Sequence, residues 1–520
     1  MIRPRMRAAL LAGFILLFGA GQALAYDPPA GGLLVSSLPS PLGLAVGGSV
    51  TALDAPWADR LNPAASAGQQ RPALDAGFVA FSDFGASGQG FGGAGGLGVS
   101  VPKPYAVLGA SLRLLSVPAT MSAMPLGTIF ETRGTIAKDL FPNLYVGAGL
   151  GLSLGSNQGA FGWGLGLDLG FVHLLGDRGF LKDLRWGGVL SGLGKGYSTA
   201  LPAAGNLGTS PSSSYPSAFS LGLGVRTLLV RSADWKVGLG FDLSAPSFQD
   251  LGLNLSANLS FRDLVTLRSS WGFTARELVA GSNRSLVPAF SLAATIPVER
   301  KADDSFLSRQ GWNKGELKPS LTAAPLYGGV WAVGGGMTIP LGVVDKKPPK
   351  IEVKFPSTPI PASAPQPPTA AGGAPAPFYL SPNSDGAQDL LEIPLSISDE
   401  RYLVSFTMTV FKGQPKSLDP VSIEELKAEK KAEREAAAGQ PEAAAATLAE
   451  GEPVRVIANK ETRPETQGLE GLWARLGYVK KGVPVPDKLV WNGRSEDGSL
   501  VPDGEYSILI EAIDDNGNRA

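Results

Sequence analysis

Two segments between residues 143 and 176 alternate strictly between apolar residues and small or polar ones. From Phe161 to Phe171 every odd position is large and apolar, and every even position is Gly or Asp. From Leu144 to Leu154 the apolar residues occupy the even positions, with Tyr, Gly or Ser between them. A period of two places the two sets on opposite faces of an extended strand. The pattern predicts two strands joined in a hairpin by a turn at residues 156–158.

Strands of roughly ten residues that alternate in this way are typical of a transmembrane β-barrel. The alternative is a soluble β-sandwich, whose strands usually have only about five or six residues. Strand length and the 68 glycines among 520 residues favour the barrel, an all-β fold of about fourteen strands within residues 71–345. Besides the hairpin, the predicted strands are residues 74–82, 97–101, 105–116, 129–137, 184–193, 219–230, 235–243, 251–261, 265–273, 288–298, 321–327 and 330–341.

The first 25 residues have the composition of a signal peptide. A basic start with Arg3, Arg5 and Arg7 precedes an apolar stretch, and Ala23-Leu24-Ala25 forms a small-residue cleavage site. The mature chain is therefore expected to be exported. Within a membrane it must form a closed barrel, because open sheet edges cannot face lipid.

Few charged residues fall on the predicted lumen side of the strands. A water-filled porin has a more polar interior, so this lumen favours a channel for hydrophobic substrates or a closed barrel. Two long polar connections, Thr199–Pro216 and Lys301–Lys318, are expected on the cell exterior, opposite the tight turns. The lumen-facing candidates are Arg113, Asp168, Arg226, Lys236, Asp242, Arg262 and Arg268.

The composition gives little support to enzyme activity. The chain has no cysteine and a single histidine, His173, on the apolar face of its strand, where we interpret it as an interfacial or packing residue. A Ser-His-Asp triad or a metal cluster is therefore not expected. An Asp/Glu pair is the remaining alternative, although no such pair stands out. A net charge of −1 gives no reason to expect nucleic acid as a partner, and no cofactor is expected.

Residues 43–67 contain small residues, two acidic side chains and a proline that enforces a turn. Gly47 and Gly48 are followed by Thr51-Ala52 with Asp54, and then by Asn62-Pro63-Ala64. With the barrel that follows, to about residue 345, this segment resembles the outer-membrane long-chain fatty-acid transporter family (FadL-like) and its secretion-associated relatives. The resemblance implies fourteen strands and a plug formed by residues 26–70 inside the barrel. It also implies that Gly47, Gly48, Asp54, Asn62, Pro63 and Ala64 take part in ligand gating. The alternative is a plain periplasmic lead-in.

Residues 346–377 are rich in Pro, Ala and Ser and are expected to form an extended linker. Residues 378–520 resemble the immunoglobulin-like domain of flagellar-hook-capping proteins (FlgD-like), through Ser381–Asp389, Trp491–Tyr506 and Asp514–Asn518. Residues 421–450 are expected to be a helical insertion. The last strand of this domain is expected to be missing, supplied by a neighbour, or lost by truncation. The pattern of Asn383, Asp385 and Asp389 indicates a turn, with a weak Ca²⁺ site as the alternative.

The sequence thus predicts a barrel in the outer membrane of a diderm bacterium, with the C-terminal domain in the periplasm. Its leading function is passive passage of hydrophobic small molecules such as long-chain fatty acids. The alternative is an anchor or scaffold whose C-terminal domain binds envelope or secreted proteins. The expected partners are outer-membrane lipid, a hydrophobic ligand and an envelope protein.

Overall fold

The computed structural model describes residues 43, 49–53, 56–83, 90–118, 127–157, 160–195, 219–246, 251–275, 287–301, 312–326, 330–353, 380–382, 389–399, 402–414, 451–464 and 468–520. The chain divides into two compact units. The barrel unit comprises residues 1–344 together with 468–477, and the second unit comprises residues 345–467 and 478–520. Each unit is described by itself.

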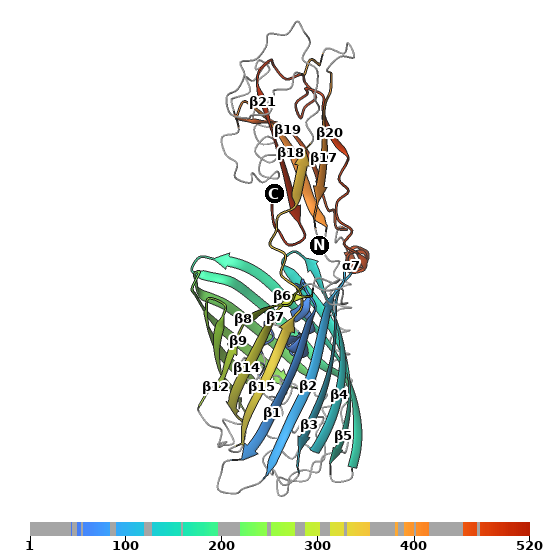
Figure 1. Ribbon diagram of the computed structural model, residues 1–520. Helices are drawn as coiled ribbons and strands as arrows, with labels where there is room; N and C mark the ends of the chain where they lie inside the picture. The colour runs from blue at the N-terminus through green and yellow to red at the C-terminus, as the bar shows by residue number, and fades with distance from the viewer. Residues whose placement is uncertain are drawn as a thin grey trace. The chain divides into compact units, whose positions relative to one another are not determined.

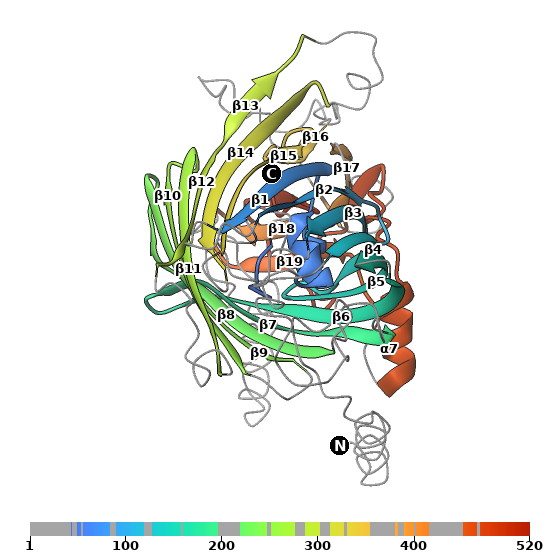
Figure 2. The same cartoon turned by 90° about the horizontal axis from the view of Figure 1, so that it is seen from below.

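The barrel unit is a closed antiparallel sheet (Figures 1 and 2). Each strand pairs with its neighbours in sequence, and β1 pairs with β15 along eleven residues to close the ring. β12 and β13 lie on either side of Thr295 and both pair with β14, so together they count as one strand of the barrel. The barrel therefore has 14 strands, which confirms the predicted number. The strands are β1 (Ala73–Asp83), β2 (Phe91–Pro102), β3 (Val107–Val117), β4 (Gly127–Phe141), β5 (Leu144–Asn157), β6 (Ala160–Arg178), β7 (Leu181–Lys195), β8 (Ser220–Arg231), β9 (Trp235–Pro246), β10 (Gly252–Phe261), β11 (Val265–Thr274), β12 (Ala289–Ala294), β13 (Ile296–Glu299), β14 (Lys314–Pro325) and β15 (Val330–Pro340).

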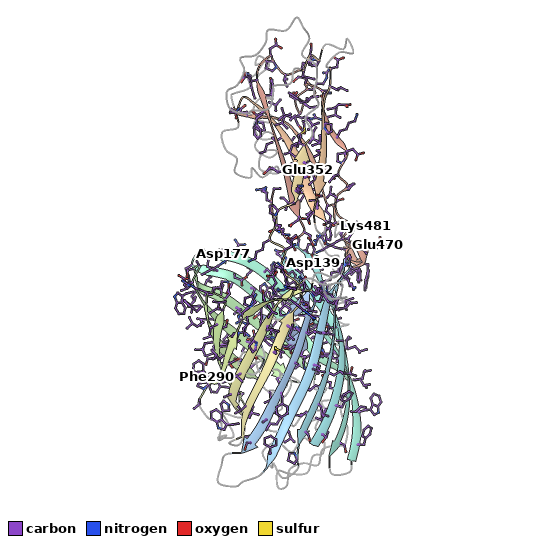
Figure 3. The ribbon with its side chains drawn as sticks, viewed as in Figure 1. Asp139, Asp177, Phe290, Glu352, Glu470 and Lys481 are labelled. Carbon is purple, nitrogen blue, oxygen red and sulfur yellow. The ribbon has the colours of Figure 1, made fainter. Side chains whose placement is uncertain are left out.

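The outer wall of the barrel exposes large apolar side chains. On β6 the odd-numbered residues face outward, among them Phe161 at 67% exposure, while Asp168 on the other face is 4% exposed. Phe290 of β12 likewise points away from the barrel (Figure 3). So large an apolar surface is not found facing water on soluble monomers, so we assign it to lipid, as in other transmembrane barrels. None of the described helices is long and apolar enough to span a membrane.

One end of the barrel carries the tight turns, such as residues 142–143, 179–180 and 232–234, and is called the tight-turn end below. Strand direction places the connection between β13 and β14, which joins Glu299 to Lys314, at this same end. The connection between β7 and β8 lies at the opposite end. The prediction that Thr199–Pro216 and Lys301–Lys318 share one face is therefore wrong. The charges of the second segment concealed a strand, because Lys314–Lys318 begins β14 and Lys314 pairs with Glu299 at 2.8 Å.

The second unit contains two three-stranded sheets. One has the order β16 (Lys350–Val353), β17 (Leu391–Ser398) and β20 (Lys488–Trp491), and the other has β19 (Pro453–Lys460), β18 (Leu403–Lys412) and β21 (Tyr506–Asp514). Apolar residues of both sheets form one core, in which Met408 is fully buried and Trp491 packs 5.4 Å from the Tyr506 ring. The unit is thus a small β-sandwich. The predicted helical insertion 421–450 and most of the linker lie outside the described residues.

Candidate functional site

A plug, defined here as residues 49–53 and 56–67, lies inside the barrel (Figure 2). It contains two short 3₁₀ helices, η1 (Trp57–Arg60) and η2 (Pro63–Ser66), which contact each other, and η2 contacts β4, β5 and β6. An apolar cluster that includes Trp57 and Leu61 packs within it. Ala58 and Ala64 have no exposed surface at all. The plug is therefore packed against the wall as a core is, and is not draped across the opening.

Asn62 links the plug to the barrel wall. It precedes Pro63 at the start of η2, where its Oδ1 accepts a hydrogen bond from the Ala64 backbone amide at 3.0 Å, as favoured N-terminal capping residues do. Its Nδ2 donates to the carbonyl oxygens of Val50 at 2.6 Å and of Phe171 on β6 at 3.1 Å. Asn62 is 1% exposed. One side chain therefore joins both halves of the plug to β6.

A second attachment is made by Asp242 on β9. Its Oδ1 accepts hydrogen bonds from the backbone amide of Val50 at 3.0 Å and from the Ser49 hydroxyl at 3.3 Å. Ser49 also lies 2.9 Å from the Thr51 hydroxyl oxygen. Since Asp242 is 5% exposed, these groups satisfy one oxygen of a buried carboxylate, whose Oδ2 has no hydrogen-bond partner among the described residues.

A third attachment consists of charges on η1, β3 and β4. Glu131 on β4 accepts from Arg60 of the plug at 2.7 Å and from Arg113 of β3 at 2.5 Å. Arg133, two residues further along β4, pairs with Asp168 of β6. All of these side chains are less than 10% exposed. Removing one member of such a buried cluster leaves an uncompensated charge, which is strongly destabilising.

Asp59 of the plug adds a titratable group. Its Oδ2 accepts a hydrogen bond from Thr135 of β4 at 3.4 Å. The plug is not one of the membrane-spanning strands, but its interior position removes Asp59 from water. That burial raises the pKa of Asp59 from its ordinary value to about 7, against the attraction of Arg133 and the hydrogen bond from Thr135.

Glycines of the lumen face make room for the plug. A Cβ at Gly147 of β5 would overlap the Pro63 carbonyl group, and one at Gly170 of β6 would overlap the Asn62 side chain. Since backbone atoms cannot move aside as a side chain can, Gly147 is required by the close approach of the two chains. The small face of the alternating pattern is thus complementary to the plug.

The lumen has a different lining at the end opposite the tight turns. There the inward side chains form an apolar cluster, and Phe81 of β1, Leu115 of β3 and Ile129 of β4 are its largest members on those strands, each at most 1% exposed. The cluster extends to β14 through Ala324 and to β15 through Val330. The lumen is therefore apolar at the end opposite the tight turns. Nearer the tight-turn end it is occupied by the plug, which is held by hydrogen bonds and ion pairs.

The structure places the predicted residues unequally. Asn62, Pro63 and Ala64 belong to the plug, whereas Gly47, Gly48 and Asp54 lie outside the described residues. Five charges face the lumen: Arg113, Asp168 and Asp242 have the contacts above, Arg226 of β8 donates to Asn258 at 3.2 Å, and Arg268 of β11 lies opposite Asn258 and Ser291.

The other two predicted lumen charges, Lys236 and Arg262, lie at the tight-turn end, and only Lys236 keeps the lumen-side parity of Asp242. Arg262 is a correction: it sits in the turn after β10, with φ of 50°, and pairs with Asp234 at 2.7 Å. The alternation of β10 ends at Phe261, one residue before it. Lys236 pairs with Asp263 of the same turn at 2.6 Å.

Four functional residues were missed from the sequence: Asp59, Arg60, Glu131 and Arg133. Glu131 and Arg133 fall within a strand that was predicted, at alternate positions. Charges two residues apart in a membrane strand must share the lumen face, which is the signal that could have found them. It was obscured because Ile129 and Phe130 place apolar side chains on both faces of β4.

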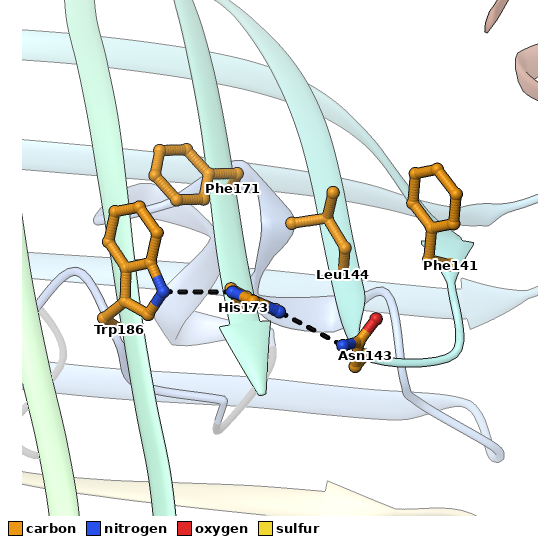
Figure 4. A pocket seen from close by; sticks show the side chains of 6 residues that line it. All are labelled: Phe141, Asn143, Leu144, Phe171, His173 and Trp186. Carbon is orange, nitrogen blue, oxygen red and sulfur yellow. Dashed lines mark hydrogen bonds between the residues drawn. The ribbon is translucent and has the colours of Figure 1, made fainter. Parts of the chain in front are cut away.

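A pocket lies on the outer wall near the tight-turn end, lined by Phe141, Asn143, Leu144, Phe171, His173 and Trp186 (Figure 4). Trp186 Nε1 donates to His173 Nδ1 at 3.0 Å, and His173 Nε2 lies 3.1 Å from the Asn143 amide. Because Nδ1 accepts from Trp186, the imidazole proton lies on Nε2, and Nε2 can donate to Asn143 only when the Asn143 amide is oriented with its oxygen toward the ring. Both ring nitrogens are thus used in the packing of the wall, as in a membrane-interface residue.

Among its described residues, the second unit holds one group of carboxylates that could bind a cation. Asp345, Asp399 and Asp514 have oxygens within 4.8 Å of one another. Asp514 Oδ1, however, already accepts from the amides of Asn516 at 2.9 Å and Asn518 at 2.7 Å, which is turn chemistry. Of the weak Ca²⁺ candidates, Asn383 and Asp385 lie outside the described residues, and Asp389 is not in this group.

Comparisons with known proteins return only solved structures. No family model and no curated protein matches the chain. The structural matches include the toluene transporter TbuX of Ralstonia pickettii, at 10% identity and a TM-score of 0.36, covering 58% of this chain and 96% of that one. They include a FadL homologue of Pseudomonas aeruginosa, at 12% and 0.31, covering 56% and 94%. The outer membrane protein Omp33 of Acinetobacter baumannii matches at 7% and 0.29, covering 52% and 98%. At these values the likeness is that of one β-barrel to another.

Proposed function

We propose that the barrel lets hydrophobic small molecules of the long-chain fatty-acid class cross the outer membrane passively, with the plug as its gate. The observation that carries the proposal is the division of the lumen. An apolar cluster around Phe81, Leu115 and Ile129 occupies the end of the lumen opposite the tight turns, and a plug with polar attachments lies nearer the tight-turn end. A water-filled porin needs no apolar lumen, whereas an apolar ligand entering from outside would find favourable contacts there.

The plug contacts support gating because they can be exchanged for water. Asn62, Asp242 and Glu131 hold the plug through hydrogen bonds and ion pairs. The net stability of such contacts is modest, since water replaces them when they open. The plug can therefore undock without unfolding the sheet, whose own backbone bonds close the ring. Asn62, Pro63 and Ala64, together with Gly47, Gly48 and Asp54, are proposed to move in this step.

The polar part of the lumen favours an amphiphile over a plain hydrocarbon. Below the apolar cluster, Arg226 and Arg268 line the wall beside buried hydroxyl groups such as Ser256 and Ser270. A carboxylate head would gain charge-assisted hydrogen bonds in such surroundings, and an alkyl tail would not. We therefore expect faster uptake of a long-chain fatty acid than of its uncharged hydrocarbon.

A reversible lock on the plug tests the proposal. The chain has no cysteine, and a Cβ at Gly222 of β8 would lie 3.0 Å from Val50 Cγ1, a spacing compatible with a disulfide. In liposomes containing the full chain with Val50→Cys and Gly222→Cys, oxidation is expected to stop uptake of labelled fatty acid, and reduction to restore it. Each single substitution serves as its control.

Equal uptake in the oxidised and reduced states would refute the gate. Uptake no greater than that of empty liposomes, by a barrel shown to be folded, would refute transport itself. The anchor or scaffold function would then be the better account, with the second unit as the part that binds envelope or secreted proteins. The chain leaves the barrel after Pro340, at the tight-turn end, and such turns face the periplasm in known barrels. We therefore propose that the second unit is periplasmic.

A further inference from the structure

Helix α7 (Gly468–Gly477) belongs to the barrel unit, although its neighbours in sequence on both sides belong to the second unit. It lies outside the wall beside the end of β4 (Figures 1 and 2). Lys138 Nζ of β4 donates to the carbonyl of Leu476 at 2.7 Å, and Arg475 Nε donates to the carbonyl of Leu140 at 2.6 Å. The Arg475 guanidinium also lies 4.2 Å from the centroid of the Phe141 ring.

These contacts orient the helix. Lys138 shares the outward parity of Ile136, which is 38% exposed, yet Lys138 is only 8% exposed. It is buried where α7 lies against it, and its ammonium group meets the carbonyl end of the helix, where cations are stabilising. The side of α7 that includes Arg475 and Leu476 thus faces the wall.

Another side of α7 carries exposed apolar residues. Leu469 is 64% exposed and Trp473 is 70% exposed. They are four residues apart and therefore lie one above the other on the helix. Glu470 and Ala474 follow each of them by one position, about 100° further around. The helix thus offers an apolar edge next to the wall and a polar edge beyond it.

The apolar edge continues a surface already assigned to lipid. Phe141 contacts Arg475 on one side and lines the outer-wall pocket with Phe171 and Trp186 on the other. Tyr105, at the same end, carries Lys138 over its ring at 4.2 Å. Aromatic rings at strand ends mark the membrane–water boundary of transmembrane barrels. An isolated exposed Trp would need no explanation, but a Leu–Trp edge at this boundary does.

We propose that α7 lies in the membrane interface at the tight-turn end, with Leu469 and Trp473 inserted into the phospholipid leaflet beside β4. Their side chains reach about 5–10 Å into the boundary between headgroups and acyl chains, as those of interfacial helices do. Glu470 and Ala474 face water. The helix is thus a peripheral membrane contact outside the lumen, independent of any transport by the barrel.

The absence of native cysteine gives a direct test. In the full chain, Leu469→Cys and Glu470→Cys are each labelled with an environment-sensitive fluorophore and reconstituted in phosphatidylethanolamine/phosphatidylglycerol vesicles. The label at 469 is expected to be quenched by lipids brominated in the upper acyl chain and protected from aqueous iodide. The label at 470 is expected to show the opposite. The pair Trp473→Cys and Ala474→Cys repeats the comparison, and the heat-modifiable mobility of each variant reports that its barrel is folded.

Strong iodide quenching at both 469 and 470, without quenching by brominated lipid, would overturn the proposal because the helix would then lie in water. Protection of 469 from both quenchers would overturn it as well, since a protein surface would then cover the edge. Neither result would bear on uptake through the lumen, which is measured separately.

Discussion

Replacing Asn62 by alanine should undock the plug. The substitution removes the acceptor of the Ala64 amide and the donor to the Val50 carbonyl, both inside the plug, and the donor to Phe171 on the wall. Each buried polar group left without its partner costs about 1–3 kcal/mol. The Phe171 carbonyl belongs to a sheet strand, so we do not count it as left without a partner. Only the Ala64 amide and the Val50 carbonyl are counted. The docked state should then lose about 3 kcal/mol, which corresponds to a roughly hundredfold increase in the undocked fraction.

A buried cysteine reports that fraction even when it is small. Ser66 is 1% exposed, so Ser66→Cys should react with a water-soluble maleimide only when the plug undocks. Adding Asn62→Ala should accelerate labelling about a hundredfold in folded barrels. Asn258→Ala is the matched control, because this lumen asparagine bonds to Arg226 of the wall. An unchanged labelling rate in the Asn62 variant would refute the assignment of Asn62 as an attachment of the plug.

The same labelling assay tests three further substitutions. Gly147→Ala should weaken docking of the plug by about 1–3 kcal/mol because its Cβ meets the Pro63 carbonyl. The control Gly151→Ala, whose Cβ has no neighbour nearer than 3.8 Å, should be tolerated. Equal labelling rates in the two variants would contradict the overlap of a residue 147 side chain with Pro63. Glu131→Gln leaves two buried arginines without their carboxylate and should weaken docking by about 3–5 kcal/mol, and a rate like that of the parent would show that the ion pairs do not hold the plug. The docked plug raises the pKa of Asp59 from 3.8 to about 7, so docking is favoured at low pH and is weakened as pH rises from about 4 to 7. Because maleimide reacts with the thiolate, the labelling rate is divided by that of the Asp59→Asn protein at each pH. This ratio should rise between about pH 4 and 7, and a flat ratio would contradict the role of Asp59.

The barrel was accessible from the sequence because its constraint is local. Alternation along β5, β6, β9 and β10 follows from a wall with lipid on one side, and each strand carries that pattern by itself. Strand ends were less well predicted. β2 begins at Phe91, six residues before the predicted start, because residues 91–96 are mostly glycine and lack the apolar half of the pattern. Arg262 was misplaced for the opposite reason, since the alternation of β10 was extended into the turn.

The attachments of the plug could not be predicted in the same way. Arg60 and Glu131 are 71 residues apart in the sequence, and Val50 and Asp242 are 192 apart. The sequence around each of these residues does not indicate which residue it pairs with, because the strand register of the closed sheet determines which lumen positions lie close together. The resemblance to the fatty-acid transporter family suggested a plug, but only the register identifies Glu131 as its ion-pair partner. Helix α7 was also missed, although Leu469, Leu472, Trp473 and Leu476 have helical spacing.

The glycines of β5 and β6 belong both to the local alternation that predicts the strands and to the contacts between the plug and the wall. A lumen filled only with water has no need of glycine, and glycine weakens a strand relative to residues with side chains. Gly147 and Gly170 nevertheless occupy the lumen face at the points where Pro63 and Asn62 approach the wall. The loss of strand stability is offset only when the plug occupies that space. The glycines of the alternating pattern that predicts the barrel therefore also provide the space that the plug fills. We conclude that the docked plug is part of the folded structure of the barrel.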